Sequence, residues 1–158
     1  MSVKVSRFYR YINTTPTSSA SPTYARLGEG MSSLTPSLNG NIEEKQYINS
    51  DVPKKTRTSY GKQWAFSADY DPTDPAQEYL YSLAEKTEAD VSTYLIELYC
   101  DDASKKTFTA KKYPVIVDIS NDGGLEGGGV VSMEGTIHAT GEAETGTFDI
   151  TTNTFTAA

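Results

Sequence analysis

Apolar and polar residues alternate along several short stretches of this chain. The clearest stretch is 131–140, where Val131, Met133 and Ile137 fall on one side and polar residues fall on the other. A period of two is that of a β-strand with one buried face. The same reasoning predicts strands over 3–12, 24–27, 64–70, 91–100, 114–119 and 131–140.

One segment follows the helical period instead. Asp74 can cap a helix that begins at Pro75, and Gln77 stands where a capping box places its polar residue. Apolar residues then recur at helical spacing and form one stripe: Ala76, Tyr79, Leu80, Leu83 and Ala84. We therefore expect one helix with this stripe against a sheet, and with Gln77 and Glu78 in water.

Length and composition fit a single, mainly β domain. The chain has 158 residues, which suits one core of ordinary size. Thr, Ser, Gly and Tyr are abundant, a mixture that favours strands and turns. One helix covers one face of such a sheet but leaves its edges open, and open edges pair readily with further copies of a chain.

A long polar segment interrupts the strand pattern between residues 38 and 61. It reads LNGNIEEKQYINSDVPKKTRTSYG, which is too polar for a core. Loops of this length inside a compact domain are uncommon and are usually functional or disordered. Four apolar residues are spaced along it, Ile42, Tyr47, Ile48 and Val52. They favour a loop over 39–61 that docks on another surface, and disorder of the isolated chain is the alternative.

The charge balance is acidic. Twenty-one acidic side chains against 14 basic ones give a formal net charge of −7, so the average surface repels phosphate and ordinary nucleic-acid binding is disfavoured. The same acidity also fits simple solubility. No apolar stretch has the length of a signal peptide or a membrane span, so we expect no membrane partner and synthesis in the cytoplasm.

The sequence offers little support for catalysis, a metal or a cofactor. Cys100 and His138 are the single cysteine and the single histidine, which excludes an internal disulfide and the common zinc sites. We expect a core thiol and a surface imidazole rather than a catalytic pair. The glycine-rich segment 121–129 lacks the Lys-Ser/Thr of a phosphate loop and has Gly129 where a calcium loop needs a carboxylate, so we predict a hairpin turn.

Three motifs, in order along the chain, carry a resemblance to a known family. They are EEKQYIN at 43–49, the D-P-x-x-x-Y pattern at 74–79 and the closing GTFDITTNTFTAA at 146–158. With the strands between them, they resemble the major tail tube proteins of long-tailed (siphovirus-type) bacteriophages of Gram-positive hosts. The resemblance covers nearly the whole chain.

The resemblance implies an antiparallel β-sandwich or half-barrel with one flanking α-helix. It implies a single domain over 1–158 with an N-terminal strand or arm over 1–13, the docking loop 39–61 and a C-terminal tail over 146–158. Six copies would close into a ring, and rings would stack into a hollow tube through which the genome leaves. The implied partners are further copies, a tape measure protein, a tail terminator and distal tail or baseplate proteins. The implied location is the virion tail.

In this family pattern the loop 39–61 reaches a neighbouring subunit or ring. The expected contact residues are Ile42, Glu43, Glu44, Tyr47, Ile48, Val52, Lys54, Lys55 and Arg57. The three basic residues would meet carboxylates such as Glu43 or Glu44 on a neighbour, and full solvation of each is the alternative.

A tube that passes DNA without specific binding needs walls without basic side chains. The polar side of the strand over 131–140 suits such a wall, and Glu97 is a weaker candidate. The expected lumen residues are Ser132, Glu134, Thr136, His138, Thr140 and Glu97. Alternation alone leaves outer solvent exposure of this face equally open.

Two other functions are also compatible with the sequence. One is the tube of a contractile tail or a secretion needle. The other is a monomeric β-sandwich that binds glycans through some of its 11 tyrosines.

Overall fold

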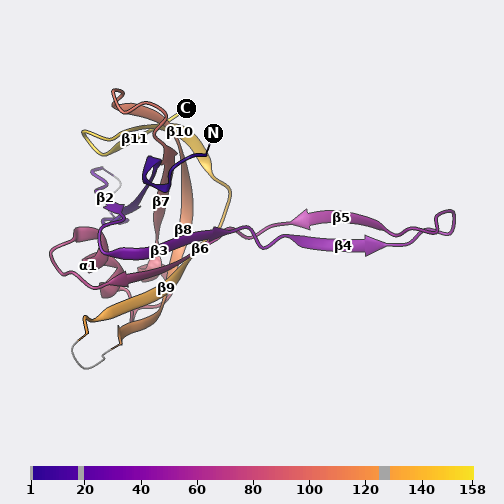
Figure 1. Ribbon diagram of the computed structural model, residues 1–158, viewed down its shortest axis with the longest axis horizontal. Coiled ribbons are helices and arrows are strands. Elements are labelled where there is room, and N and C mark those ends of the chain that lie inside the picture. The colour runs from indigo at the N-terminus through magenta and orange to yellow at the C-terminus, as the bar shows by residue number, and fades with distance from the viewer. Residues whose placement is uncertain (1, 18–19, 125–128) are drawn as a thin grey trace.

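The computed structural model describes residues 2–17, 20–124 and 129–158 of the chain. Most strands form one curled antiparallel sheet, a half-barrel, from which a separate two-stranded hairpin projects (Figure 1). The strands of the half-barrel are β1 (Phe8–Asn13), β2 (Tyr24–Leu27), β3 (Met31–Ser37), β6 (Gln63–Asp69), β7 (Ser92–Tyr99), β8 (Thr107–Gly124), β9 (Ser132–Ala139), β10 (Glu144–Asp149) and β11 (Thr154–Ala157). The helical elements are η1 (Val5–Arg7), α1 (Pro75–Ser82) and η2 (Glu88–Val91). Among the described residues, no helix combines the length and the apolar character needed to cross a membrane.

The long strand β8 organises the sheet. The strand order is β2-β1-β7-β8-β9-β6-β3, and β10 with β11 also attaches to β8. Residues 107–112 of β8 pair with β10, whereas the part from Val115 onward pairs with β9. Pro114, which has no amide hydrogen to donate, lies where the partner changes. Proline is tolerated within a strand at a place of this kind because no ladder hydrogen bond from its nitrogen is required there.

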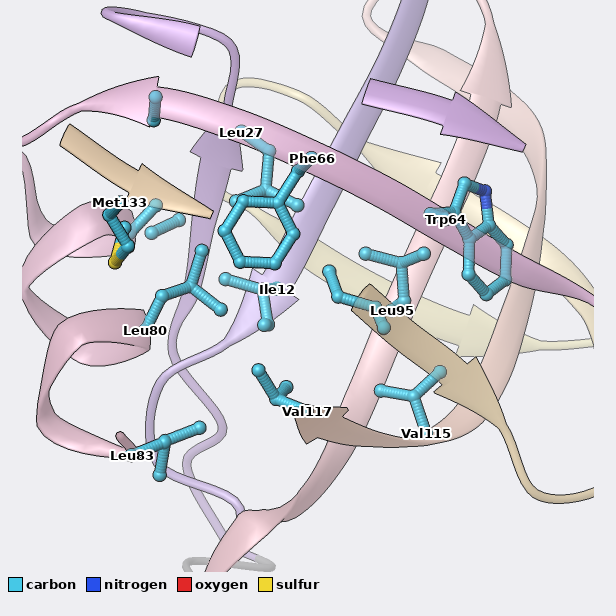
Figure 2. Close-up of a cluster of buried hydrophobic side chains, with 14 of the residues drawn as sticks. Ile12, Leu27, Trp64, Phe66, Leu80, Leu83, Leu95, Val115, Val117 and Met133 are labelled. Carbon is cyan, nitrogen blue, oxygen red and sulfur yellow. The ribbon is translucent and has the colours of Figure 1, made fainter. Parts of the chain in front are cut away.

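Two apolar clusters stabilise the domain. The first lies between the sheet and α1, and Figure 2 shows Trp64, Leu80, Leu95 and Met133 converging in it. All four side chains are 0% exposed. The second cluster packs on the other side of the sheet, beneath β10, and contains Tyr11, Tyr24, Ile96, Leu98, Cys100, Phe108, Ala110 and Phe148.

The strand β7 contributes to both clusters. Leu95 belongs to the first and Ile96 to the second, and both are fully buried. Consecutive strand residues point to opposite faces, so β7 is covered on both faces here.

The helix begins as predicted, because the Asp74 carboxylate accepts a hydrogen bond of 2.9 Å from the Ala76 backbone N–H. The prediction that Gln77 faces water is wrong. Gln77 is 1% exposed, accepts a hydrogen bond from the Asp71 backbone N–H and donates one to the Glu29 carbonyl. Its amide thereby links α1 to two loops, which is how a buried polar side chain is normally satisfied.

Other segments also differ from the sequence prediction. The range 39–61 is not an irregular loop, because it contains β4 (Asn41–Lys45) and β5 (Lys54–Ser59), which pair with each other. The C-terminal tail 146–158 contributes β11 and most of β10 to the sheet. The expected N-terminal strand starts only at Phe8, after the short η1. Part of the predicted turn 121–129 lies outside the described residues.

Candidate interaction surfaces

Four neighbouring strands present one continuous polar surface, which we call the polar face. Their registered partners place the same side chains together: Ser33 opposite Ser67, Ser67 opposite Glu134, and Thr136 opposite Asp118. Directly opposed residues in antiparallel strands point to the same side of a sheet. The polar face consists of Ser33, Thr35, Ser37, Gln63, Ala65, Ser67, Asp69, Ser132, Glu134, Thr136, His138, Ile116 and Asp118.

The charges of the polar face all have one sign at neutral pH. Asp69, Asp118 and Glu134 are exposed carboxylates, and none of the residues that define the face is a lysine or an arginine. The remaining members are mostly hydroxyl side chains, and His138 contributes an imidazole. A polyanion meets no fixed cation on this surface.

Four of the sequence-predicted wall residues lie together on this face: Ser132, Glu134, Thr136 and His138. Thr140 lies just beyond β9, where both its backbone N–H and its hydroxyl donate to the Pro114 carbonyl at 2.8 and 3.2 Å. The contributions of β3, β6 and β8 to this face were not predicted from the sequence. Their alternation was visible, but only the strand register joins them to β9.

The prediction for Glu97 is corrected by the structure. Glu97 is registered opposite Lys111, and its side chain points to the side of Leu95 and Tyr113, away from the polar face. Its carboxylate accepts hydrogen bonds from Arg10 Nε at 3.0 Å, Trp64 Nε1 at 3.1 Å and Lys62 Nζ at 3.1 Å. Glu97 therefore holds three elements together and does not line that face.

Charge and burial compete at this site. Burial alone raises the pKa of Glu97, but the hydrogen bonds from Arg10 and Trp64 and the charge of Lys62 outweigh it and hold the pKa below its usual value. Burial likewise lowers the pKa of Lys62, yet its bonds to Tyr113 and Glu97 raise it overall. Both groups are therefore ionised at neutral pH. Because Lys62 directly follows the hairpin, the network also fixes the point where the hairpin leaves the sheet.

The second candidate surface is the hairpin β4–β5 itself, which extends far from the half-barrel (Figure 1). At its neck the Gly61 N–H donates to the Leu38 carbonyl at 2.9 Å, and the Asn39 side chain donates to the Gly61 carbonyl at 3.2 Å. Every residue of both strands is exposed. Neither face of the hairpin is covered by the half-barrel, which explains why the sequence shows no buried stripe here.

The hairpin brings together all nine sequence-predicted contact residues. Among its apolar side chains, Ile42 is 54% exposed, Tyr47 53%, Ile48 111% and Val52 74%. One of the basic residues already has a carboxylate partner within the same chain: Lys55 forms an ion pair with Glu44 at 3.5 Å. Both partners are largely exposed, so this ion pair contributes about 0–1 kcal/mol.

The residues considered for catalysis lie in different environments. Cys100 is buried in the second cluster, whereas His138 lies on the polar face. Within the part of the chain that the structure describes, no group of three or more His, Cys, Asp or Glu side chains could hold a metal ion.

Comparison with solved structures identifies the fold. A chain in the tail of an empty GTA particle, refined with helical and sixfold symmetry, matches with a TM-score of 0.65 at 13% identity, over 99% of this chain and 100% of that chain. A chain in the virion of a native gene transfer agent particle matches with a TM-score of 0.64 at 11% identity, over 99% and 100%. A chain from the sheath/tube terminator of an extracellular contractile injection system matches with a TM-score of 0.53 at 9% identity, over 92% and 96%.

These likenesses establish a shared fold over nearly the full length of each chain. No family model matches the sequence, and no curated protein matches it either. At such low identity the fold is retained while individual side chains have changed.

Proposed function

We propose that this chain is the structural, non-enzymatic subunit of a hollow tail tube. Copies join through the open edges of their half-barrels into six-membered rings, and the rings stack through the hairpin β4–β5. Edge strands β2, β3 and β11 have one unpaired side among the described residues, and pairing them between copies satisfies their backbone groups. The fold shared with a chain from a tail of sixfold symmetry supports this arrangement.

The hairpin is the observation that carries the proposal. An isolated two-stranded hairpin is marginally stable in water, and this one has no cover on either face. It nevertheless exposes four large apolar side chains toward its tip and neck. Two lysines, Lys45 and Lys54, also stand directly opposite each other, which is unfavourable unless a further anion is near. Burial against a neighbouring ring would remove all three unfavourable features: the uncovered hairpin faces, the exposed apolar side chains and the unneutralised lysine pair.

The polar face is proposed as the wall of the bore. Its hydroxyls and carboxylates offer DNA no cation to bind, so successive phosphates pass without accumulating contacts. This assignment includes Ser132, Glu134, Thr136 and His138 and extends to Ser67 and Asp118. Thr140 stands at the rim of this wall.

The sequence resemblance gives the proposal its finer form. A siphovirus-type phage of a Gram-positive host would carry this subunit in its virion tail after synthesis in the host cytoplasm. Tape measure, terminator and distal tail or baseplate proteins would contact its two ends and its interior. A tube of a contractile system is the second candidate, and the fold shared with a contractile injection system chain favours it. The glycan-binding alternative is weakened because Tyr11, Tyr24 and Tyr113 lie in the cores.

Negative-stain electron microscopy of the purified chain tests assembly. We expect rings, and rods at higher concentration. Replacing residues 42–58 with a two-residue Asn-Gly turn should leave the far-ultraviolet circular dichroism and the melting of the half-barrel nearly unchanged, because the hairpin strands pack on neither cluster. That variant should form rings but no rods. Rods from the hairpin-less variant would refute the stacking role, and a wild-type chain that stays monomeric would refute the tube.

The bore assignment has its own test. Thr136→Lys would place a ring of cations on the proposed wall, and Glu85→Lys adds a cation at an exposed position near the end of α1. Co-sedimentation of short DNA with assembled tubes should increase for the first variant, and the increase should disappear at high salt. Equal retention by both variants would contradict an inward-facing position of Thr136.

A further inference from the structure

A cavity of about 550 Å³ opens at the neck of the hairpin. It is lined by the end of β5, by the Tyr60–Lys62 linker, by Tyr113, and by Ala139 at the end of β9 with the four residues that follow it. The lining combines two cations, two aromatic rings and small apolar side chains, with Glu142 as its acidic member. Such a mixture suits an apolar segment that also carries a negative charge.

The two cations of this neck cavity are not equivalent. Lys62 is engaged, since its ammonium donates to Glu97 and to the Tyr113 hydroxyl, each at 3.1 Å. Arg57 has no carboxylate partner among the ion pairs of the described residues. Its guanidinium lies 5.2 Å from the centre of the Tyr60 ring. It also lies against Gly40, where any Cβ would meet Arg57 Nε at 2.7 Å.

The tip of the hairpin, residues 46–53, has the matching chemistry. It carries Ile48 and Val52, which are 111% and 74% exposed, and Asp51 is its one charged residue. At about 3.4 Å per residue β4 (Asn41–Lys45) alone spans roughly 14 Å, and the tip lies beyond its end. The tip therefore stands well away from its own neck (Figure 1) and can reach such a cavity only on another copy.

We propose that the hairpin tip of one copy docks in the neck cavity of a copy in the next ring, with Asp51 facing Arg57. Ile48 and Val52 lie against Tyr60 and Tyr113 in this arrangement. The inference rests on the proposed tube function and names the receiving surface of its ring-to-ring contact. A tip-to-neck contact joins two different surfaces of the same chain, and contacts of this kind repeat without closing and so build an open filament.

Charge reversal with mixing tests this pairing. Asp51→Arg and Arg57→Asp should each melt like the wild type, because both side chains are exposed. Each variant alone should form rings but should need at least about tenfold more protein to form rods, because every ring-to-ring contact then opposes like charges. Preformed rings of the two variants, once mixed, should build rods again. When the two kinds of ring alternate, the arginine tip of one variant meets the aspartate neck of the other, and the next contact joins the natural Asp51 tip to the natural Arg57 neck.

The outcomes separate this inference from the tube function. Rods from Arg57→Asp alone at the wild-type concentration would overturn the docking site, as would two sets of rings that fail to stack after mixing. The tube function would survive both results, because wild-type rods would still form. A wild-type chain that forms neither rings nor rods would instead remove the function on which the inference rests.

Discussion

Replacing Glu97 by alanine should destabilise the subunit by about 2–3 kcal/mol. The carboxylate satisfies donors on Arg10, Lys62 and Trp64, and only Lys62 keeps another partner, the Tyr113 hydroxyl. Leaving a buried donor unpaired costs about 1–3 kcal/mol. Some water still reaches the site, because Arg10 and Glu97 keep 13% and 18% of their side-chain exposure, so the total stays below the sum for two fully buried donors.

Thermal unfolding of dilute, unassembled protein measures this loss. For a domain of this size the change corresponds to a fall in Tm of about 5–10 °C. Glu97→Gln keeps one acceptor oxygen and should lose about half as much. Glu85→Ala is the matched control, because Glu85 is exposed and forms none of the described ion pairs. It should stay within about 0.5 kcal/mol of the wild type.

The stability that Glu97 contributes should also depend on pH, in a direction that its pKa determines. The pKa of Glu97 is lowered by folding, so its stabilising contribution is complete above its ordinary value of 4.5 and is lost as the pH falls through the lower, folded value. The difference in Tm between the wild type and Glu97→Ala should therefore be full at pH 7 and should shrink below about pH 4.5. A Glu97→Ala variant as stable as the control, or a difference that does not change with pH, would refute the role of this network.

Three further substitutions probe the fold by chemical denaturation. Leu80→Ala should cost about 2–5 kcal/mol, because this side chain is 0% exposed between α1 and the sheet; a loss below 1 kcal/mol would contradict its place in the core. Gly135→Ala should cost about 1–3 kcal/mol, since a Cβ there would collide with the Asp118 carbonyl, whereas Gly28→Ala, with nothing within 4 Å, is its control. Asp74→Ala removes the helix cap and should cost about 1 kcal/mol, and an unchanged midpoint would show that the cap is dispensable.

The sequence predicted the elements whose two faces differ. β6 and β9 each have one buried and one wetter face, so their alternation was visible. The start of α1 was predicted for a similar reason, because Asp74 and Pro75 act on adjacent backbone groups. These are local effects, and a local pattern is sufficient to find them.

The burial of β7 on both faces and the positions of Gln77 and Glu97 depend on distant partners. Leu95 and Ile96 are both buried because β7 lies between two clusters, which no period reveals. Gln77 and Glu97 resemble surface residues until Glu29 and Arg10, far away in sequence, reach them. The hairpin differs from these cases, because a two-stranded ribbon exposed on both faces has no apolar stripe by which its sequence could predict strands.

The candidate surfaces also combine parts that a local sequence pattern predicts with parts that depend on distant residues. The polar side of β9 could be recognised from its own residues. Its extension across β6, β3 and β8 required the register, such as Ser67 opposite Glu134. The neck cavity could not be predicted, because it joins the end of β5 to Tyr113 and to residues 139–143.

One strand ties the two halves of this molecule into a single mechanical unit. β8 is 18 residues long; near its start it carries Phe108 and Ala110 in the second cluster, and near its middle it carries Val115 and Val117 in the first. A force that peels one half away must also pull on the other, so neither can yield separately. A wall built from such units would resist internal pressure as one connected structure. It would break by the detachment of whole subunits rather than by local unfolding within a subunit.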